Sequence, residues 1–186
     1  MQERLAHTLF DEGLVKKTDR ILCAVSGGAD SMVMSYLLHR IGLDIVIAHC
    51  NFQLRDSESD ADESFVSQFC SENNIPFVYK RFNTKAYSRA NKLSIQEAAR
   101  KLRYDWFEEQ KEQHKCDWIC TAHNLSDNAE TILINQIRGT GIKGLTGIPV
   151  QRDNILRPML TFSAKDMRTY ANEQNVAYRN DISNAS

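Results

Sequence analysis

A turn rich in glycine and serine, "SGGADS" at residues 26–31, joins two apolar segments and has the composition of an anion-binding loop. Adjacent glycines let backbone N–H groups approach an anion without obstruction by Cβ atoms. If a helix begins here, its N-terminus adds partial positive charge, and the two serine hydroxyls add donors. No lysine follows the glycines, so the loop is not a Walker motif. We expect the main chain and hydroxyls to bind phosphate, the alternative being a tight turn with Asp30 or Ser31 as a simple helix cap. The phosphate-binding residues would be Ser26, Gly27, Gly28, Ala29, Asp30 and Ser31.

Two further polar segments follow apolar runs. The first, "HCNFQLRD", contains His49 and Asn51, and the second, "AHNLSDNAE", contains His123, Asp127 and Glu130. Asp127 and Glu130 are three residues apart, so at a helix start they share one face, where two carboxylates hold amines through charge-assisted hydrogen bonds. The same spacing also suits a helix cap. The residues alone leave both interpretations open.

The segment 79–103 is strongly basic, with eight Lys and Arg residues against one Glu, and has Tyr79, Phe82 and Tyr87 interleaved. Such a strip can bind a phosphate backbone and unstacked bases, or can be a solvated face beside a mobile loop. Arg103 lies beside the apolar stripe of its helix, from which a guanidinium can reach a phosphate, unless it forms a surface ion pair with Glu109 or a neighbouring residue.

Apolar runs predict strands at about 20–25, 44–50, 76–82 and 117–122, each short and bounded by polar or turn residues. Helical patterns lie between and after them, at 31–41, 59–73, 94–114, 129–138 and 163–175. Capping boxes are expected at Ser94-x-x-Glu97 and Ser163-x-x-Asp166, and the third of these helices should bury Ile95, Ala98, Leu102 and Trp106. The alternation predicts an α/β fold: an open, mostly parallel twisted sheet with helices on both faces. In such sheets ligands bind at the carboxyl ends of strands, where the three polar segments would converge.

Composition favours one soluble domain of 186 residues, with a net charge of −1 and no uncharged run long enough to span a membrane. The charged N-terminus is not a signal peptide. Five cysteines, an odd number, favour reduced thiols and a cytoplasmic location. Cys116 and Cys120 lack the further ligands of a zinc site.

The segment "GTGIKG" at 139–144 matches the letters of a dinucleotide-binding fingerprint. It follows a helical pattern, whereas that fingerprint must follow a strand and begin a helix. We therefore interpret it as a flexible loop over or beside the site.

The loop "SGGADS" resembles the SGGxDS signature of the N-type ATP pyrophosphatases, the PP-loop family. Within this family the chain resembles the members that form lysidine in tRNA. The similar segments span roughly residues 20–184: "AHCNFQLR", "SIQEAARKLRYDWF", "TAHNLSDNAETILINQIRGTGIKGLTGIP", "LRPML" and "YRNDISN". The resemblance implies that ATP activates the C2 oxygen of the wobble cytidine in the CAU anticodon of tRNA-Ile, releasing pyrophosphate. The ε-amine of free L-lysine then displaces AMP.

The expected reaction suggests roles for individual residues, and the resemblance itself supports those of Asp127, Glu130 and His123. Asp127 and Glu130 would recognise lysine; Asp30, Arg103 and His123 would be catalytic; and Asp30 would bind Mg²⁺ unless it caps its helix. His49 and Asn51 would line the adenosine pocket. Weaker tRNA contacts are expected from Arg55, Lys85, Arg89 and Arg100.

The chain departs from the family pattern near the expected pocket. His123-Asn124 stands where members often have His-His, Ser126-Asp127 where they have an acidic pair, and Phe52 and Gln53 replace other residues. These departures change the surroundings of the expected pocket but remove none of the assigned residues.

Residues 1–186 are expected to form one catalytic domain, with further tRNA-binding domains following in the natural protein, and a homodimer is possible. Two other functions stay open. A 2-thiolating PP-loop enzyme would act on the same cytidine but would need a C-x-x-C pair, whereas Cys116 and Cys120 are spaced C-x-x-x-C. A non-catalytic adenine-nucleotide-binding module is the other alternative.

Overall fold

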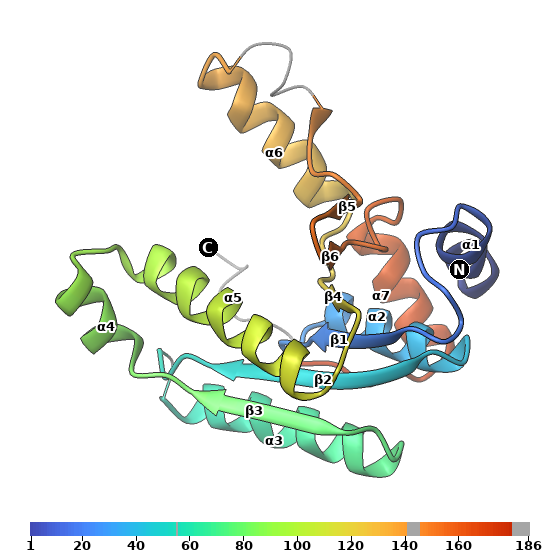
Figure 1. The fold of residues 1–186 in the computed structure, drawn as a ribbon, viewed down its shortest axis with the longest axis horizontal. Helices are drawn as coiled ribbons and strands as arrows, with labels where there is room; N and C mark the ends of the chain where they lie inside the picture. The colour runs from blue at the N-terminus through green and yellow to red at the C-terminus, as the bar shows by residue number, and fades with distance from the viewer. Residues whose placement is uncertain (55, 141–145, 180–186) are drawn as a thin grey trace.

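A computed structural model describes residues 1–54, 56–140 and 146–179 and contains one mixed sheet within them (Figure 1). The strand order is β3-β2-β1-β4-β6-β5, and all neighbours are parallel except the β5–β6 pair. The strands are β1 (Arg20–Ala24), β2 (Asp44–Asn51), β3 (Phe77–Arg81), β4 (Trp118–Cys120), β5 (Gln151–Arg152) and β6 (Ile155–Leu156). The expected open, mostly parallel α/β sheet is confirmed.

The strand order reverses direction between β1 and β4. From β1 the chain proceeds outward through β2 and β3, and it then returns to add β4 on the other side of β1. The loops after β1 and β4 consequently leave the same edge of the sheet on opposite sides of a crevice. This is the position at which open α/β sheets bind ligands.

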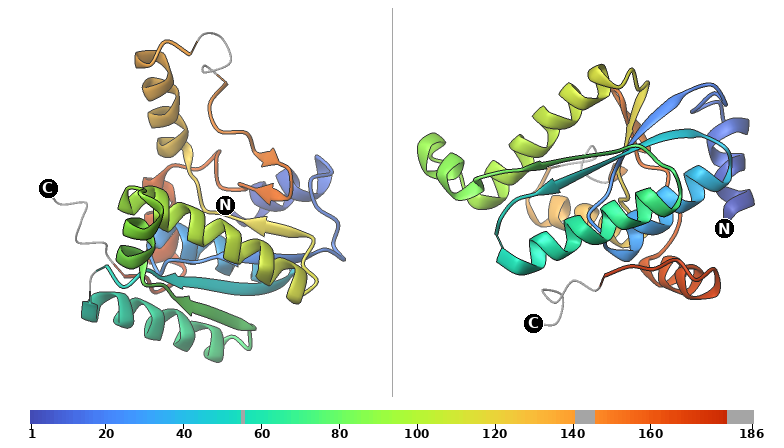
Figure 2. Two further views of the ribbon diagram at one scale, coloured as in Figure 1. Left: turned by 60° about the vertical axis from the view of Figure 1, so that its left-hand side comes forward. Right: turned by 90° about the horizontal axis from the view of Figure 1, so that it is seen from below.

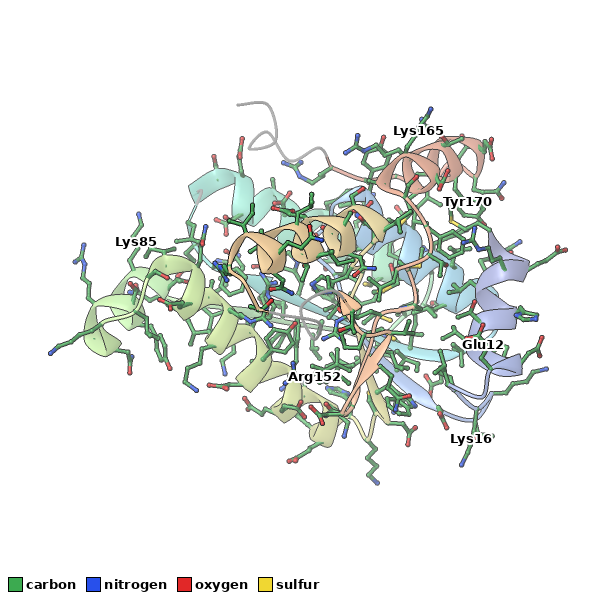
Figure 3. All side chains as sticks on the ribbon, turned by 90° about the horizontal axis from the view of Figure 1, so that it is seen from above. Glu12, Lys16, Lys85, Arg152, Lys165 and Tyr170 are labelled. Atoms are coloured by element: carbon green, nitrogen blue, oxygen red, sulfur yellow. The ribbon has the colours of Figure 1, made fainter. Side chains whose placement is uncertain are left out.

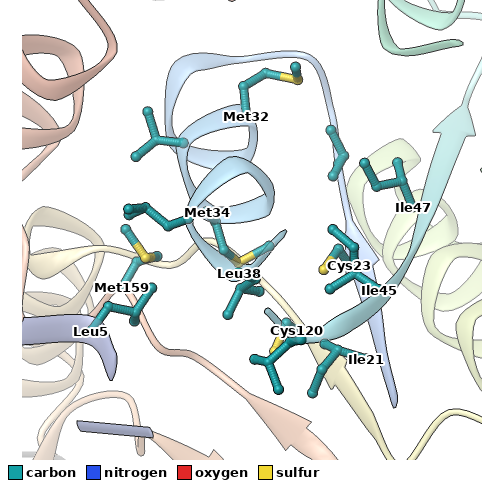
Figure 4. Close-up of a cluster of buried hydrophobic side chains, with 14 of the residues drawn as sticks. Leu5, Ile21, Cys23, Met32, Met34, Leu38, Ile45, Ile47, Cys120 and Met159 are labelled. Atoms are coloured by element: carbon teal, nitrogen blue, oxygen red, sulfur yellow. The ribbon is translucent and has the colours of Figure 1, made fainter. Parts of the chain in front are cut away.

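Alternating residues of the central strands build two hydrophobic layers. Ile21 and Cys23 of β1 pack into the larger core, whereas Leu22 between them packs on the other face with Trp106 and Phe107. Burial on both faces explains why these strands are continuous apolar runs. Figure 4 shows the larger core, in which Met32, Met34 and Leu38 of α2 lie against residues from β1, β2 and β4.

The helices that cover the sheet are α2 (Ala29–Arg40) and α3 (Asp56–Glu72) on one face and α5 (Ile95–Gln113) on the other (Figures 1 and 2). Helix α7 (Ala164–Glu173) packs on α2, as does α1 (Gln2–Ala6), which continues into the π-helical turn η1 (His7–Asp11). Both predicted capping boxes form, at the starts of α5 and α7. The capping-box residues therefore correctly predicted where these two helices begin.

Two packing expectations were wrong. Ile95 is 37% exposed, because the first turn of α5 extends beyond the sheet, although Ala98 and Trp106 are buried as expected. Phe82 is buried between Phe52 and Trp106 and does not lie on the basic surface. The basic segment also contains a helix that the sequence analysis did not identify, α4 (Thr84–Asn91).

Helix α6 (Leu125–Ile137) stands away from the sheet (Figure 1). None of its residues is buried, and its apolar side chains Leu133 and Ile137 are 58% and 86% exposed. Only its N-terminus lies at the sheet, so α6 brings Asp127 but not its outer turns to the central crevice.

Candidate functional site

A cavity of about 600 Å³ lies at the carboxyl edge of the sheet, within the usual size range of small-molecule sites. Its walls come from the segments after β1 and β4, the end of β2, the first half of α3, the middle of α5, one position of α7, and Tyr178 and Arg179 near the end of the described chain. The three polar segments singled out in the sequence therefore meet in one cavity.

The loop after β1 is closed by its own serine hydroxyls. The Ser31 hydroxyl donates to the Gly28 carbonyl at 3.0 Å and accepts from the backbone N–H of Ser26 at 3.2 Å. Gly27 has a φ of +97°, a conformation that glycine adopts at little cost. Gly28 is the N-cap residue of α2 and has no side chain to accept the first N–H groups of the helix. These N–H groups have no intrahelical partner, so they are available to an anion.

Asp30 does not cap α2. Its carboxylate instead accepts a hydrogen bond of 2.9 Å from the side-chain amide of Asn124, which begins α6 on the other side of the crevice. The carbonyl of the same amide accepts from the N–H groups of Ser126 and Asp127, so Asn124 is held at both ends. Burial raises the pKa of Asp30 above its ordinary value, while the Asn124 contact opposes this. Asn124 is a site residue that the sequence analysis did not assign.

Asp127 lines the cavity, and Glu130 does not belong to its lining. One oxygen of Asp127 accepts from the Asn124 N–H at 2.8 Å in a capping box, so the helix-cap interpretation of Asp127 is confirmed. The other oxygen of this carboxylate is not used in the capping box. Glu130 is exposed one turn further along α6. Beside Asp127, His123 pairs with the Thr121 hydroxyl at 2.9 Å, and burial lowers the pKa of His123, which favours a neutral ring.

His49 and Asn51 lie in the wall formed by the end of β2. The His49 Nδ1 lies 2.9 Å from the Val25 carbonyl, which can only accept, so Nδ1 carries the proton and Nε2 is an acceptor in the neutral ring. Burial lowers the pKa of His49 and so favours that neutral ring.

The side chain of Asn51 is engaged by the protein. Its amide donates to the carboxylates of Asp60 and Glu63, and its carbonyl accepts from the Gln53 N–H. A contact of this side chain with adenosine would have to replace one of these bonds.

Arg103 reaches the cavity from α5, with its guanidinium carbon 5.1 Å from the centre of the Phe52 ring. The expected alternative is not seen in the described part of the chain, where Glu109 pairs with Lys80 at 3.5 Å and not with Arg103. A cation stacked on an aromatic face is held in position while its N–H groups remain available.

Two cationic residues of the cavity were missed by the sequence analysis. Arg168 projects from α7, and Arg179 comes from the segment after it. The backbone N–H of Arg179 donates to the Gly27 carbonyl at 2.9 Å, and its guanidinium pairs with Asp62 of α3. The motif "YRNDISN" was noticed for its resemblance, but no local pattern shows that its arginine reaches the loop. Residues 180–184 of that motif lie outside the described residues.

Of the expected RNA contacts that the structure describes, none belongs to the cavity lining. Lys85 and Arg89 are exposed on α4, and Lys85 projects from the outer end of the molecule (Figure 3). Arg100 is exposed at the start of α5, with its guanidinium 4.9 Å from the Tyr104 ring centre. Arg55 and residues 141–145 of the "GTGIKG" loop lie outside the described residues.

All five cysteines are free thiols, as expected. Among residues 1–54, 56–140 and 146–179, no three Cys, His, Asp or Glu side chains group as a metal site. One carboxylate with phosphate oxygens is nevertheless a usual Mg²⁺ environment, and Asp30 beside the glycine loop fits it. No helix in the described part of the chain has the length and apolar character to cross a membrane.

Comparison with known proteins agrees with this geometry. The family model for the PP-loop domain matches residues 1–186. The tRNA(Ile)-lysidine synthase of Porphyromonas gingivalis is 40% identical over 99% of this chain, and that of Chlorobaculum tepidum is 42% identical over 98%. Among solved structures, the U34-tRNA thiolase NcsA from Methanococcus maripaludis, with its [4Fe-4S] cluster, aligns with a TM-score of 0.77. At 19% identity, over 96% of this chain and 64% of the thiolase chain, that match describes the fold alone.

The chain spans 41% and 56% of the lengths of the two lysidine synthases that it matches.

Proposed function

The chain belongs to the PP-loop family, and we propose that it is the catalytic domain of an enzyme that joins L-lysine to the wobble cytidine of tRNA-Ile with a CAU anticodon, using ATP. The observation that carries this proposal is the convergence of a glycine phosphate loop, an arginine and a helix-start carboxylate in one cavity. Identity of 40% to a tRNA(Ile)-lysidine synthase over nearly the whole chain supports the choice of substrate.

The reaction divides between the two sides of the crevice. The N–H groups and hydroxyls of residues 26–31 would hold the triphosphate, and the His49 Nε2 would accept from a hydroxyl or amino group of adenosine. Arg103, on its Phe52 platform, would stabilise charge at the α-phosphate when the cytidine oxygen attacks. The α–β phosphoanhydride bond breaks, and pyrophosphate leaves with the electron pair.

Lysine enters on the α6 side. The Asp127 oxygen not used in the capping box would bind a lysine amine, and Glu130 is proposed to contact a more exposed part of the same molecule. The attacking ε-amine must lose protons as its nitrogen bonds to C2 and AMP departs. His123 is a suitable acceptor, because burial lowers its pKa and keeps the ring neutral.

Asp30 would hold Mg²⁺, which neutralises phosphate charge when bound. The Asn124 amide keeps the Asp30 carboxylate aimed across the crevice. We also propose that Lys85, Arg89, Arg100 and Arg55 contact the tRNA and that the protein acts in the cytoplasm. The possible homodimer stays a prediction that sedimentation velocity can measure.

The test is incubation of the protein with ATP, Mg²⁺, labelled L-lysine and tRNA-Ile that has a CAU anticodon. Label joined covalently to tRNA, with AMP and pyrophosphate released, is the expected result. Transfer of sulfur from a sulfur donor, independent of lysine, would instead establish the thiolase alternative. Nucleotide binding without pyrophosphate release on addition of tRNA and lysine would leave only a binding module.

A further inference from the structure

Release of pyrophosphate requires positive charge near the β- and γ-phosphates. The glycine loop supplies N–H groups and hydroxyls but no lysine. Among the described residues that line the cavity, the permanent cations are Arg103, Arg168 and Arg179. Arg103 belongs to α5 and stacks on Phe52, on the opposite face of the sheet from α2. The two other arginines come from α7 and the segment after it, beside the N-terminus of α2.

Arg179 is attached directly to the glycine loop. Its N–H donates to the carbonyl of Gly27, the loop residue with φ of +97°. The main-chain bond fixes the Cα of Arg179 beside the loop, whatever its side chain does. The guanidinium is therefore within side-chain reach of any anion on the N–H groups of residues 29–31.

The present partner of that guanidinium is Asp62 of α3. Both side chains are partly exposed, 39% for Arg179 and 29% for Asp62, so the pair is screened by solvent and is easily exchanged. Phosphate oxygens accept bidentate hydrogen bonds from a guanidinium and carry more charge than one carboxylate. Pyrophosphate can therefore displace Asp62 as the partner of Arg179.

Arg168 reaches the same region from α7. Its side chain lines the same cavity as Asp30 and Arg179. Helix α7, which carries it, packs against α2 and holds this position.

We infer that Arg179, assisted by Arg168, is a pyrophosphate-binding residue that exchanges Asp62 for the β- and γ-phosphates of ATP. This inference rests on the proposed use of ATP, but not on lysine or tRNA. It assigns different roles to two arginines. Arg103 stabilises charge on the α-phosphate that is transferred, and Arg179 stabilises charge on the pyrophosphate that leaves.

The test is binding of inorganic pyrophosphate by calorimetry, with Mg²⁺ and without lysine or tRNA. Arg179→Gln should weaken pyrophosphate binding at least tenfold, Arg179→Lys should restore part of it, and Arg168→Gln should have a smaller effect. Asp62→Asn is the matched control, because it breaks the same ion pair but frees the guanidinium. It should bind pyrophosphate as tightly as the unchanged protein or more tightly.

A purely structural ion pair predicts the opposite pattern, in which Arg179→Gln and Asp62→Asn weaken binding equally. That result, or unchanged pyrophosphate affinity in Arg179→Gln, would overturn the inference. Affinity for AMP, which has no β- or γ-phosphate, should stay within twofold in all variants and reports an intact cavity. Failure to join lysine to tRNA would refute the proposed function while leaving this binding result intact.

Discussion

Substitution of Asn124 separates two tasks that one side chain performs. Its carbonyl caps α6, and its amide orients Asp30 across the crevice. Asn124→Ser keeps a good N-cap residue but removes the amide donor, whereas Asn124→Ala removes both. The cap is worth about 1 kcal/mol. A hydrogen bond to a charged group contributes about 1.5–3 kcal/mol when buried, and partial exposure of Asp30 reduces this to about 1 kcal/mol.

These magnitudes predict graded effects on stability. A domain of this size loses about 2–4 °C of melting temperature per kcal/mol, so Asn124→Ser should lose about 2–4 °C and Asn124→Ala about 4–8 °C. Burial raises the pKa of Asp30, and the amide contact opposes part of this rise. The stabilisation by the amide contact is therefore present when the carboxylate is ionised and is lost as pH falls through the raised pKa. The deficit of Asn124→Ser should therefore shrink at acid pH, while that of Asn124→Ala should fall only to the cap contribution.

The assay is thermal unfolding of both variants between pH 4 and 8, together with their affinity for Mg²⁺ and ATP. If removal of the amide that orients Asp30 reduces the binding free energy of ATP by about 1 kcal/mol, the affinity for ATP falls about fivefold. Equal melting temperatures for the two variants at every pH, with unchanged ATP affinity, would refute the role assigned to Asn124.

Further predictions concern lysine, the glycine turn and the histidines. Asp127→Asn should raise the KM for lysine about tenfold, the loss expected for a charge-assisted hydrogen bond, and Glu130→Gln should raise it less; equal KM values in steady-state assays would contradict both assignments. Gly27→Ala should cost about 1–3 kcal/mol because its φ is +97°. Gly28→Ala, at φ of −74° and with an added Cβ in ordinary contact with the Ser26 hydroxyl at 3.5 Å, should unfold at nearly the same denaturant concentration as the unchanged protein. Burial lowers the pKa of His49 below the unfolded value of about 6.5, so the folded state binds fewer protons than the unfolded state. The free energy of unfolding should therefore fall as pH drops below that value. The slope of this free energy against pH should decrease in His49→Gln, and an unchanged slope would contradict this.

Local signals predicted most of the architecture. The capping boxes at Ser94 and Ser163 depend on residues three positions apart, so sequence contains the whole interaction. Strands buried on both faces are likewise recognisable from local sequence, because every consecutive residue of such a strand is apolar. The carboxyl-edge cavity followed from topology, because parallel strands must end at a common edge.

Long-range contacts were the part that sequence could not supply. Asn124 and Asp30 are 94 residues apart, and Arg179 and Asp62 are 117 apart, so no spacing rule connects them. Phe82 was misplaced because the basic residues around it concealed a core position that only the packing of Phe52 and Trp106 defines. The exposure of Glu130 likewise results from the direction of α6, which points away from the sheet. Helical periodicity predicts which residues share a face but not the direction in which the helix points.

The central claim is that the turn at residues 26–31 holds the triphosphate of ATP at the junction of β1 and β4. A crystal structure of the protein with a non-hydrolysable ATP analogue tests it most directly. The account predicts β- and γ-phosphates on the N–H groups of the first turn of α2, with the α-phosphate directed toward Arg103. Nucleotide bound elsewhere, with this turn carrying no phosphate, would contradict the account.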